Sequence, residues 1–280
     1  MIGWHEWVVV LGMTNVRSFL TNELEMLQEI KEADIVLENE IDSKHLERYQ
    51  SWKLDSNKMK SLIQAESKGM EALERVKEDE NMQVEFYASG KRGMLFVNQE
   101  KTKLIKVQKF NDHGVQVIEK ECKWLEIVNR MDIGPRLLKS GNGYLMCEFL
   151  VGGLDAIAFL KHPNVTRSHV VWFLKNILYQ CFTLDVFGIN KAEMTHPMRH
   201  IIVHNGRVVF VDFEKCTYGQ QRRNVTQICQ FLASPRVVAA VTAKGHSMAI
   251  DKLRLATKQY KMKPNSKTFD TILQTLRLNN

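Results

Sequence analysis

The spacing of apolar residues changes character once along the chain, near residue 82. Before that point the chain contains no proline, and apolar side chains recur at helical spacing, as at Met70, Leu73 and Val76. This spacing predicts two or three amphipathic helices. Beyond that point, short runs alternate between apolar and polar positions, which is typical of strands. We therefore expect a mostly α-helical extension over residues 1–81, followed by a body that mixes strands and helices.

The first part of the body is predicted to be a small antiparallel sheet with one helix. Short apolar runs are separated by glycine-containing turns, a pattern typical of hairpins. One longer segment carries its apolar residues on a single helical face. We assign this unit to residues 82–150. Its predicted strands cover residues 84–86, 94–96, 102–108, 137–138 and 144–150, and its predicted helix covers residues 114–130.

The remaining residues, 151–280, are predicted to form a helical unit. A long and mostly apolar helix opens this unit, and a short strand pair turned by Asn205-Gly206 interrupts it. Strands and helices are thus largely segregated along the chain, so the expected fold class is α+β. The predicted helices cover residues 167–187, 237–261 and 267–276, and the strand pair covers residues 201–203 and 208–211.

Charge is distributed unevenly between the extension and the body. The chain has a net charge of +7, but residues 1–80 hold 10 Lys or Arg against 17 Asp or Glu, whereas residues 81–280 hold 29 against 15. A basic body suits anionic ligands such as nucleotides or RNA, and docking of the acidic extension on the body is an equal alternative. A basic C-terminal region offers an RNA contact or a solvated helix face: Lys252, Arg254, Lys258, Lys261, Lys263 and Lys267.

The cysteines and the longest apolar runs bear on the compartment. The five cysteines are scattered and never spaced as CxxC, which favours reduced thiols over disulfides or a zinc site. No apolar run approaches the roughly 18 residues that a membrane helix needs. The N-terminal apolar run has no basic residues before it and no cleavage site after it. We expect an intracellular, cytoplasmic protein that is neither secreted nor bound in a membrane.

The strongest chemical signal is the run VVFVDFEK, residues 208–215. A buried strand ends here in Asp212, and a carboxylate is costly to bury unless it is paired or binds a metal. A strand that ends in Asp-Phe is how protein kinases present their magnesium-binding aspartate. The third residue of that kinase motif is glycine, whereas this chain has Glu214.

Upstream segments supply further candidate residues. Lys106 stands between two apolar residues of a predicted strand, which makes it a candidate for an inward-facing cation. Glu121, on the following helix, precedes a buried position by one turn and is its candidate partner, with Glu119 as the alternative. A strand lysine paired with a helix glutamate holds ATP phosphates in kinases.

Two loops complete the set of candidates. The turn Ser89-Gly90-Lys91-Arg92-Gly93 places backbone N–H groups and cations near an anion, unless it is an ordinary hairpin turn. Glu193 is the only carboxylate of the loop 188–203. His200 follows it by seven residues and precedes Asp212 by twelve.

Taken in order, these segments resemble the RIO-like branch of the atypical serine/threonine protein kinases. Within that branch, the chain is most similar to the predicted archaeal-type group related to the KEOPS-complex kinase. The resemblance covers about residues 83–234. The matching segments are SGKRG, LIKV, EKECKWLEIVN, DIGPRLL, MCEFLVGG, the GI..AEM..P..HIIV loop, VDFE and RRNVTQICQFL.

This resemblance implies a two-lobed protein-kinase-like fold that binds ATP with Mg²⁺ or Mn²⁺. The first lobe would be the small sheet with its helix, and the second the helical unit. The resemblance implies that Lys106, oriented by Glu121, holds the α- and β-phosphates, which Gly90, Lys91 and Gly93 cover.

It further implies that the hinge backbone from Glu148 to Leu150 binds adenine and that Asp212, with His200, coordinates the metal. Glu193 would accept the hydroxyl proton or position the substrate.

The chain also departs from the kinase pattern. Where kinases carry His-Arg-Asp and a metal-binding Asn, this chain has Asn190-Lys191-Ala192-Glu193 and His200. Imidazole is a poorer ligand than oxygen for hard cations. We expect Lys191 to be exposed to solvent, with a phosphate-facing cation as the alternative. No long activation segment separates Glu214 from the helix that begins near residue 224.

These observations favour an ATP-dependent phosphotransferase that acts on a protein hydroxyl, as a RIO-like serine/threonine kinase. The degraded catalytic loop leaves open a pseudokinase scaffold whose N-terminal helices, within residues 1–80, bind a partner protein. The basic body leaves open an ATPase that acts with RNA. A small-molecule kinase of the aminoglycoside or choline type ranks lower, because such kinases usually keep an aspartate in the loop. The protein substrate is not identified by the sequence.

Overall fold

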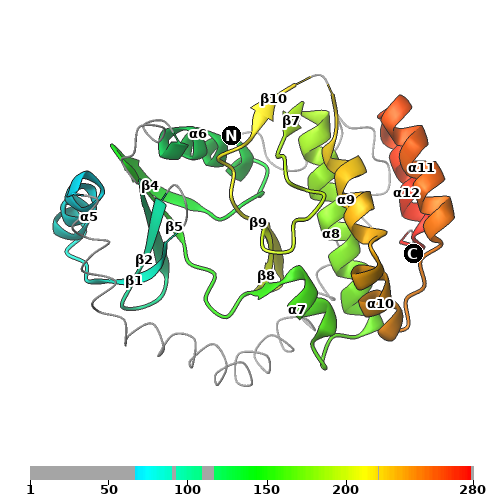
Figure 1. Ribbon diagram of the computed structural model, residues 1–280, viewed down its shortest axis with the longest axis horizontal. Coiled ribbons are helices and arrows are strands. Elements are labelled where there is room, and N and C mark those ends of the chain that lie inside the picture. Colours follow the sequence, from blue (N-terminus) through cyan, green and yellow to red (C-terminus); the bar gives the residue numbers. More distant parts are fainter. Residues whose placement is uncertain (1–66, 90–92, 109–116, 220, 279–280) are drawn as a thin grey trace.

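A computed structural model describes 200 residues in four stretches, and the elements keep their chain-order numbers in Figure 1. The helices expected before residue 67, and the turn residues Gly90 and Lys91, lie outside the described residues. The described stretches are residues 67–89, 93–108, 117–219 and 221–278.

The first lobe is built on a five-stranded antiparallel sheet. Its strand order is β1-β2-β3-β5-β4, with one helix, α6, inserted between β3 and β4. Successive side chains of a strand point to opposite faces. Ile105 and Val107 therefore face α5, while Lys106 faces α6. The elements are α5 (Ser67–Asp79), β1 (Val84–Ser89), β2 (Gly93–Asn98), β3 (Lys103–Gln108), α6 (Val117–Asn129), β4 (Leu137–Gly141) and β5 (Tyr144–Glu148).

The second lobe is mostly helical, and the larger hydrophobic core lies mainly within it and extends to α6 and β5 of the first lobe. The long apolar helix α8 packs against α9, and α9 packs in turn against α11, as Figure 1 shows. Three short strand pairings lie between this bundle and the first lobe. The elements are β6 (Leu154–Asp155), α7 (Ala156–Lys161), α8 (Arg167–Val186), β7 (Ile189–Asn190), β8 (Ile201–His204), β9 (Arg207–Phe210), β10 (Thr217–Tyr218), α9 (Asn224–Leu232), α10 (Pro235–Ala243), α11 (Ile250–Met262) and α12 (Ser266–Thr275).

The fold is α+β and kinase-like, with a small antiparallel sheet lobe followed by a helical lobe, as the sequence predicted. Across the stretches that the structure describes, no helix has both the length and the apolar character needed to cross a membrane. All five cysteines are buried and free, which agrees with the expectation of reduced thiols.

The prediction of a single helix over residues 237–261 is wrong, because this segment forms two helices, α10 and α11. Gly245 adopts a φ of +76°, a left-handed conformation that favours glycine. The N–H of Gly245 bonds to the carbonyl of Thr242, and the N–H of His246 bonds to the carbonyl of Val241. This pair of bonds is a Schellman motif, which ends a helix.

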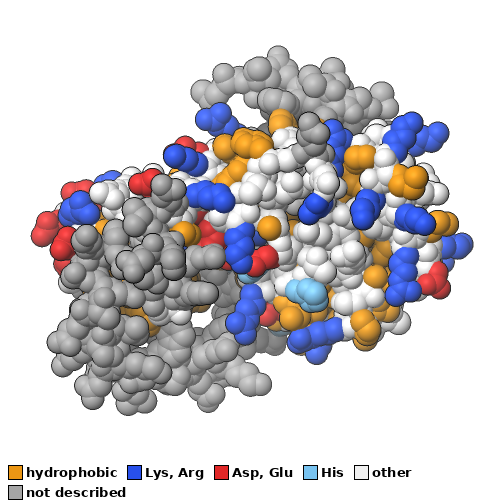
Figure 2. Space-filling model, turned by 45° about the horizontal axis from the view of Figure 1, so that its top comes forward, with side chains coloured by type: hydrophobic (Ala, Val, Ile, Leu, Met, Phe, Trp, Pro, Cys, Tyr) orange, Lys and Arg blue, Asp and Glu red, His pale blue; other side chains and the backbone are white. Residues whose placement is uncertain are grey.

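Acidic and basic side chains are also segregated on the surface. In the view of Figure 2, acidic side chains gather at the end of the molecule that holds α5, while Lys and Arg predominate over the helical lobe. The amphipathic helix α5 lies against β3 and β5, where Ala72, Leu73 and Val76 are buried.

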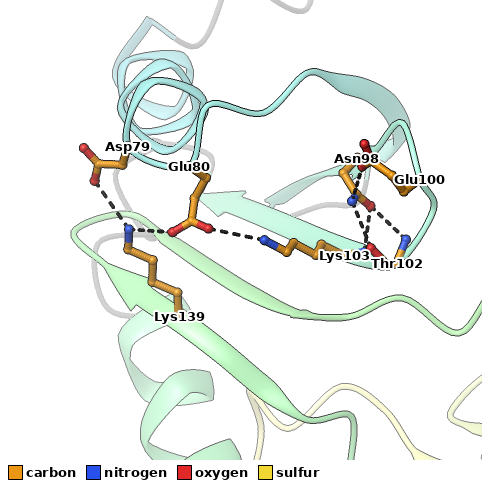
Figure 3. A network of polar contacts seen from close by, with 7 residues as sticks. All are labelled: Asp79, Glu80, Asn98, Glu100, Thr102, Lys103 and Lys139. Carbon is orange, nitrogen blue, oxygen red and sulfur yellow. Dashed lines mark hydrogen bonds and ion pairs between the residues drawn. The ribbon is translucent and has the colours of Figure 1, made fainter.

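Ion pairs fix the end of α5 to the sheet (Figure 3). Glu80 accepts bonds from Lys139 at 2.9 Å and from Lys103 at 3.3 Å, and Asp79 lies 3.6 Å from Lys139. These two lysines lower the pKa of Glu80, Lys139 having the larger effect. For residues 67–81, therefore, the acidic extension docks on the body of its own chain.

Candidate active site

The first lobe presents a buried ion pair between β3 and α6. Lys106 Nζ donates a hydrogen bond of 2.6 Å to Glu121 Oε2, and the two side chains are 17% and 7% exposed. Burial alone would lower the pKa of Lys106, but Glu121, Asp212 and Glu214 together outweigh burial, and the net pKa is raised. The alternative partner, Glu119, lies on the exposed face of α6. The structure thus brings together the lysine and glutamate that the sequence selected and keeps the lysine charged.

Gly93 leaves room beside this lysine. A Cβ atom on Gly93 would lie 2.9 Å from the carbonyl oxygen of Val107 and 3.4 Å from two side-chain carbons of Lys106. Any larger residue would therefore press on β3 at the point where Lys106 projects. Glycine is thus required at position 93 because β2 and β3 approach closely there.

The residues after β9 connect the two lobes. Glu121 Oε1 accepts a hydrogen bond of 3.4 Å from the N–H of Phe213, and Glu214 Oε2 lies 3.6 Å from Lys106 Nζ. Both Asp212 and Glu214 contribute to the raised pKa of Lys106. Sequence reasoning noted Glu214 only as a replacement for glycine, whereas here it joins the charged cluster.

Three side chains in the second lobe converge as a candidate metal site. One ligand atom each from Glu193, His200 and Asp212 lies within 4.8 Å of the others. Asp212 Oδ1 and His200 Nδ1 are buried, and neither atom has a hydrogen-bond partner. Buried polar atoms without partners are rare and suggest an absent ion or water.

This donor set fits a divalent cation. Carboxylate oxygens suit Mg²⁺ and Mn²⁺, and an added imidazole favours a transition metal. His200 Nε2 lies 3.7 Å from Asp212 Oδ2. Burial, and next the charge of Lys191, lowers the pKa of His200, so its imidazole stays in the neutral form that binds metal.

The backbone is strained at this cluster. The φ angles of Ala192, Glu193 and Asp212 are +63°, +55° and +66°, in a region of backbone conformation that residues other than glycine rarely adopt. Such conformations persist only where the surrounding structure holds them, and they concentrate at functional sites. The strain therefore marks both segments that supply ligand atoms.

The expectation that Lys191 is exposed to solvent is wrong, because the structure buries this residue (1% exposed). Its Nζ donates a hydrogen bond of 3.0 Å to the carbonyl of Asp212 and lies 5.0 Å from the ring centre of Phe213. The carbonyl of a strained residue and the face of an aromatic ring both attract a cation. Burial lowers the pKa of Lys191. The side chain supports the turn that carries Asp212.

A buried polar network anchors the loop that carries Lys191. Asn224, the first residue of α9, accepts a 2.9 Å hydrogen bond from the N–H of Lys191 and donates one of 2.6 Å to the carbonyl of Ile189. Asp185 accepts bonds from the N–H and side chain of Asn224, and from Tyr260 Oη at 3.1 Å. Burial raises the pKa of Asp185. Sequence reasoning missed Asp185, although an acid within an apolar helix was a usable signal.

Glu193 and the predicted hinge are engaged in other contacts. Glu193 is exposed and forms an ion pair with Lys215, which the sequence did not suggest. Glu148 accepts bonds of 3.0 and 3.1 Å from Arg207 on β9, so its side chain ties the two lobes together. The carbonyl of Leu150 accepts a bond of 3.0 Å from the N–H of Gly153.

Comparisons with known proteins find likeness only in structure. No protein-family model and no curated protein sequence matches the chain. The ADP-bound aminoglycoside phosphotransferase APH(2'')-Ib is 10% identical, with 74% of this chain and 98% of that chain covered and a TM-score of 0.41. A structure of titin kinase with its flanking domains is 13% identical, with 71% and 44% covered and a TM-score of 0.46. The assignment of the fold depends on the order and pairing of this chain's own elements.

Proposed function

We propose that this chain is an ATP-dependent phosphotransferase, a RIO-like serine/threonine protein kinase that transfers the γ-phosphate of ATP to a protein hydroxyl. The observation that carries the proposal is the buried Lys106–Glu121 pair, which lies close enough to Asp212 for that carboxylate to raise the pKa of the lysine. Phosphoryl transfer needs a cation for the phosphates and a carboxylate for the metal in one place.

Each residue has a role in this proposal. Lys106, oriented by Glu121, holds the α- and β-phosphates under the turn that ends at Gly93. Asp212 and His200 hold Mg²⁺ or Mn²⁺, which neutralises charge on the transferred phosphate. Glu193 exchanges its ion pair with Lys215 for the acceptor hydroxyl and takes its proton.

The remaining roles lie at the edges of the site. The hinge backbone from Glu148 to Leu150 binds adenine. Gly90 and Lys91, which lie outside the described residues, cover the phosphates from the turn. The raised pKa of Lys106 keeps its charge at every pH at which the enzyme would work.

ATP binding with and without Mn²⁺ tests the proposal. The wild type should bind ATP in a metal-dependent way, and Lys106→Ala should weaken binding about tenfold or more, since a hydrogen bond to a charged group contributes roughly 1.5–3 kcal/mol. Asp212→Asn should abolish the metal dependence. Lys123→Ala, which removes an exposed lysine of α6, is the matched control and should bind normally. Metal-dependent binding that survives in both site variants would overturn the assignment.

A pseudokinase scaffold is the second candidate, and the ion pair between Glu193 and Lys215 favours it because the base is already engaged. Turnover separates the two candidates. Metal-dependent ATP binding without autophosphorylation, substrate phosphorylation or ATP hydrolysis would identify a scaffold. Hydrolysis that RNA stimulates would instead support an ATPase acting with RNA.

A further inference from the structure

A basic groove lies beside the loop that carries Glu193, between α9 and α11. It has a volume of about 650 Å³, and Thr195 contributes to its lining. Thr195 follows Glu193 by two residues, so at most about 7 Å of chain separates the groove from the candidate base. An acceptor segment that passes Thr195 in this groove therefore lies within a few residues of the candidate base.

The charge of the groove has one sign. Arg223, Arg254, Lys258 and Lys261 line it, and no Asp or Glu does so among the residues that the structure describes. Three of these cations recur at spacings of four and three residues on α11, which places them on one face of the helix. Figure 2 shows Lys and Arg side chains concentrated over this lobe. The groove excludes polycations and attracts anions.

The three cations on α11 are available to a ligand. Lys258 and Lys261 are exposed on α11. Arg254 is paired with Asp251 at 3.1 Å, but both side chains are largely exposed, at 67% and 95%, and such pairs contribute little. Hydrogen-bond donors on Thr195 and Gln227 add neutral groups that bind carboxylates.

We propose that this groove binds acidic residues that flank the acceptor hydroxyl of a protein substrate, so that the enzyme selects Ser or Thr beside Asp and Glu. This proposal rests on the proposed function and specifies its substrate. An extended acidic peptide is favoured over RNA because none of the described residues that line the groove is aromatic, and single-stranded bases bind largely by stacking on aromatic rings.

Peptide binding, measured by fluorescence anisotropy on the full chain, tests the proposal without turnover. One labelled peptide has glutamates flanking a serine, and its counterpart has glutamines in their place. The wild type should bind the glutamate peptide about tenfold more tightly at low salt and lose the preference at high salt.

Two triple variants of equal net charge locate the binding. Arg254→Glu, Lys258→Glu and Lys261→Glu together should remove the preference for glutamate. Lys252→Glu, Lys263→Glu and Lys267→Glu change exposed lysines of the same region that do not line the groove, and this control should keep it. ATP binding should be unchanged in both variants.

The possible outcomes decide between the proposals. The assignment of the groove would be overturned if the wild type bound the two peptides equally. It would also be overturned if the two triple variants lost the preference for the glutamate peptide to the same extent. An unlabelled RNA that competes more strongly than the acidic peptide, and that depends on the groove cations, would reassign it to nucleic acid. Failure of ATP to bind, with peptide selectivity intact, would overturn the proposed function alone.

Discussion

A lysine that is fully buried next to a candidate metal-binding acid, Asp212, has a structural consequence of its own. Lys191 donates its hydrogen bond to the backbone of Asp212, not to its carboxylate, and the Asp212 side chain remains directed at Glu193 and His200. The lysine thus stabilises a strained turn without neutralising the acid that the turn presents. In the proposed mechanism it is a positioning residue.

Replacing this lysine tests its positioning role. In Lys191→Met, the free energy of unfolding should fall by about 1–3 kcal/mol, because the carbonyl of Asp212 loses its hydrogen-bond donor. Metal-dependent ATP turnover should fall about tenfold or more, because Asp212 loses its support. Turnover assays and thermal unfolding check both parts. Lys123→Met is the control, and a variant with full turnover would contradict the positioning role.

Single residues were predictable where a pattern of neighbours constrained them. Lys106 and Glu121 could be selected because strand alternation and helical spacing fix the faces on which they lie. Lys191 could not, because its burial depends on a carbonyl and a ring that lie 21 and 22 residues later in the chain. The partner of Glu193 was missed for the same reason.

At the scale of elements, α5 shows how an acidic helix is attached to a basic sheet. Its apolar side chains enter the smaller core cluster, and its C-terminal acids contact two lysines from different strands. The buried apolar side chains provide most of the attachment, since exposed ion pairs contribute little. The ion pairs instead fix where the end of the helix lies.

This attachment should depend on pH. Because the folded protein lowers the pKa of Glu80 below 4.5, the unfolded chain takes up the proton first as pH falls. The stabilisation is therefore complete above pH 4.5 and is lost below it. Glu80→Gln should lower the melting temperature by about 1–3 °C at pH 7, with the difference vanishing in acid. Thermal unfolding from pH 7 to pH 3 tests this, with Glu78→Gln of the same helix as control. A difference in melting temperature that stays constant from pH 7 to pH 3 would contradict a role for the charge of Glu80.

Most elements follow from local pattern, and their limits are less predictable. The five strands of the first lobe, the pair β8 and β9, and the long helix α8 lie where the apolar spacing placed them, within a few residues, whereas the two-residue strands β6, β7 and β10 were not predicted. The break between α10 and α11 was missed because Gly245 was the only local signal, and one glycine is tolerated in many helices.

At the scale of the molecule, the five cysteines report on both lobes. Cys122 and Cys147 belong to the sheet lobe, whereas Cys181, Cys216 and Cys229 belong to the helical lobe. Burial raises the pKa of Cys122 to about 11 and that of Cys147 to about 12. Only the thiolate reacts with common thiol reagents, so each lobe carries its own protected probes.

The native protein should therefore resist thiol modification at pH 8. A thiol with a pKa of about 11 is ionised in roughly one molecule in a thousand, and its burial slows the reaction further. All five thiols should react in denaturant. Mass spectrometry of partly labelled protein should show either none or five modified when the lobes unfold together. A population labelled only in one lobe would instead show that the lobes unfold separately.

The short strand β10 restricts the segment that follows Asp212. Only nine residues separate Glu214 from Asn224, and β10 pairs within them with β7, just ahead of the candidate base. Tyr218 of β10 also lies against Trp124 of α6, with ring centres 4.7 Å apart. A phosphotransferase built in this way has no long loop that could swing between an off and an on position. In the proposed phosphotransferase, any regulation would therefore act through parts of the chain other than this segment.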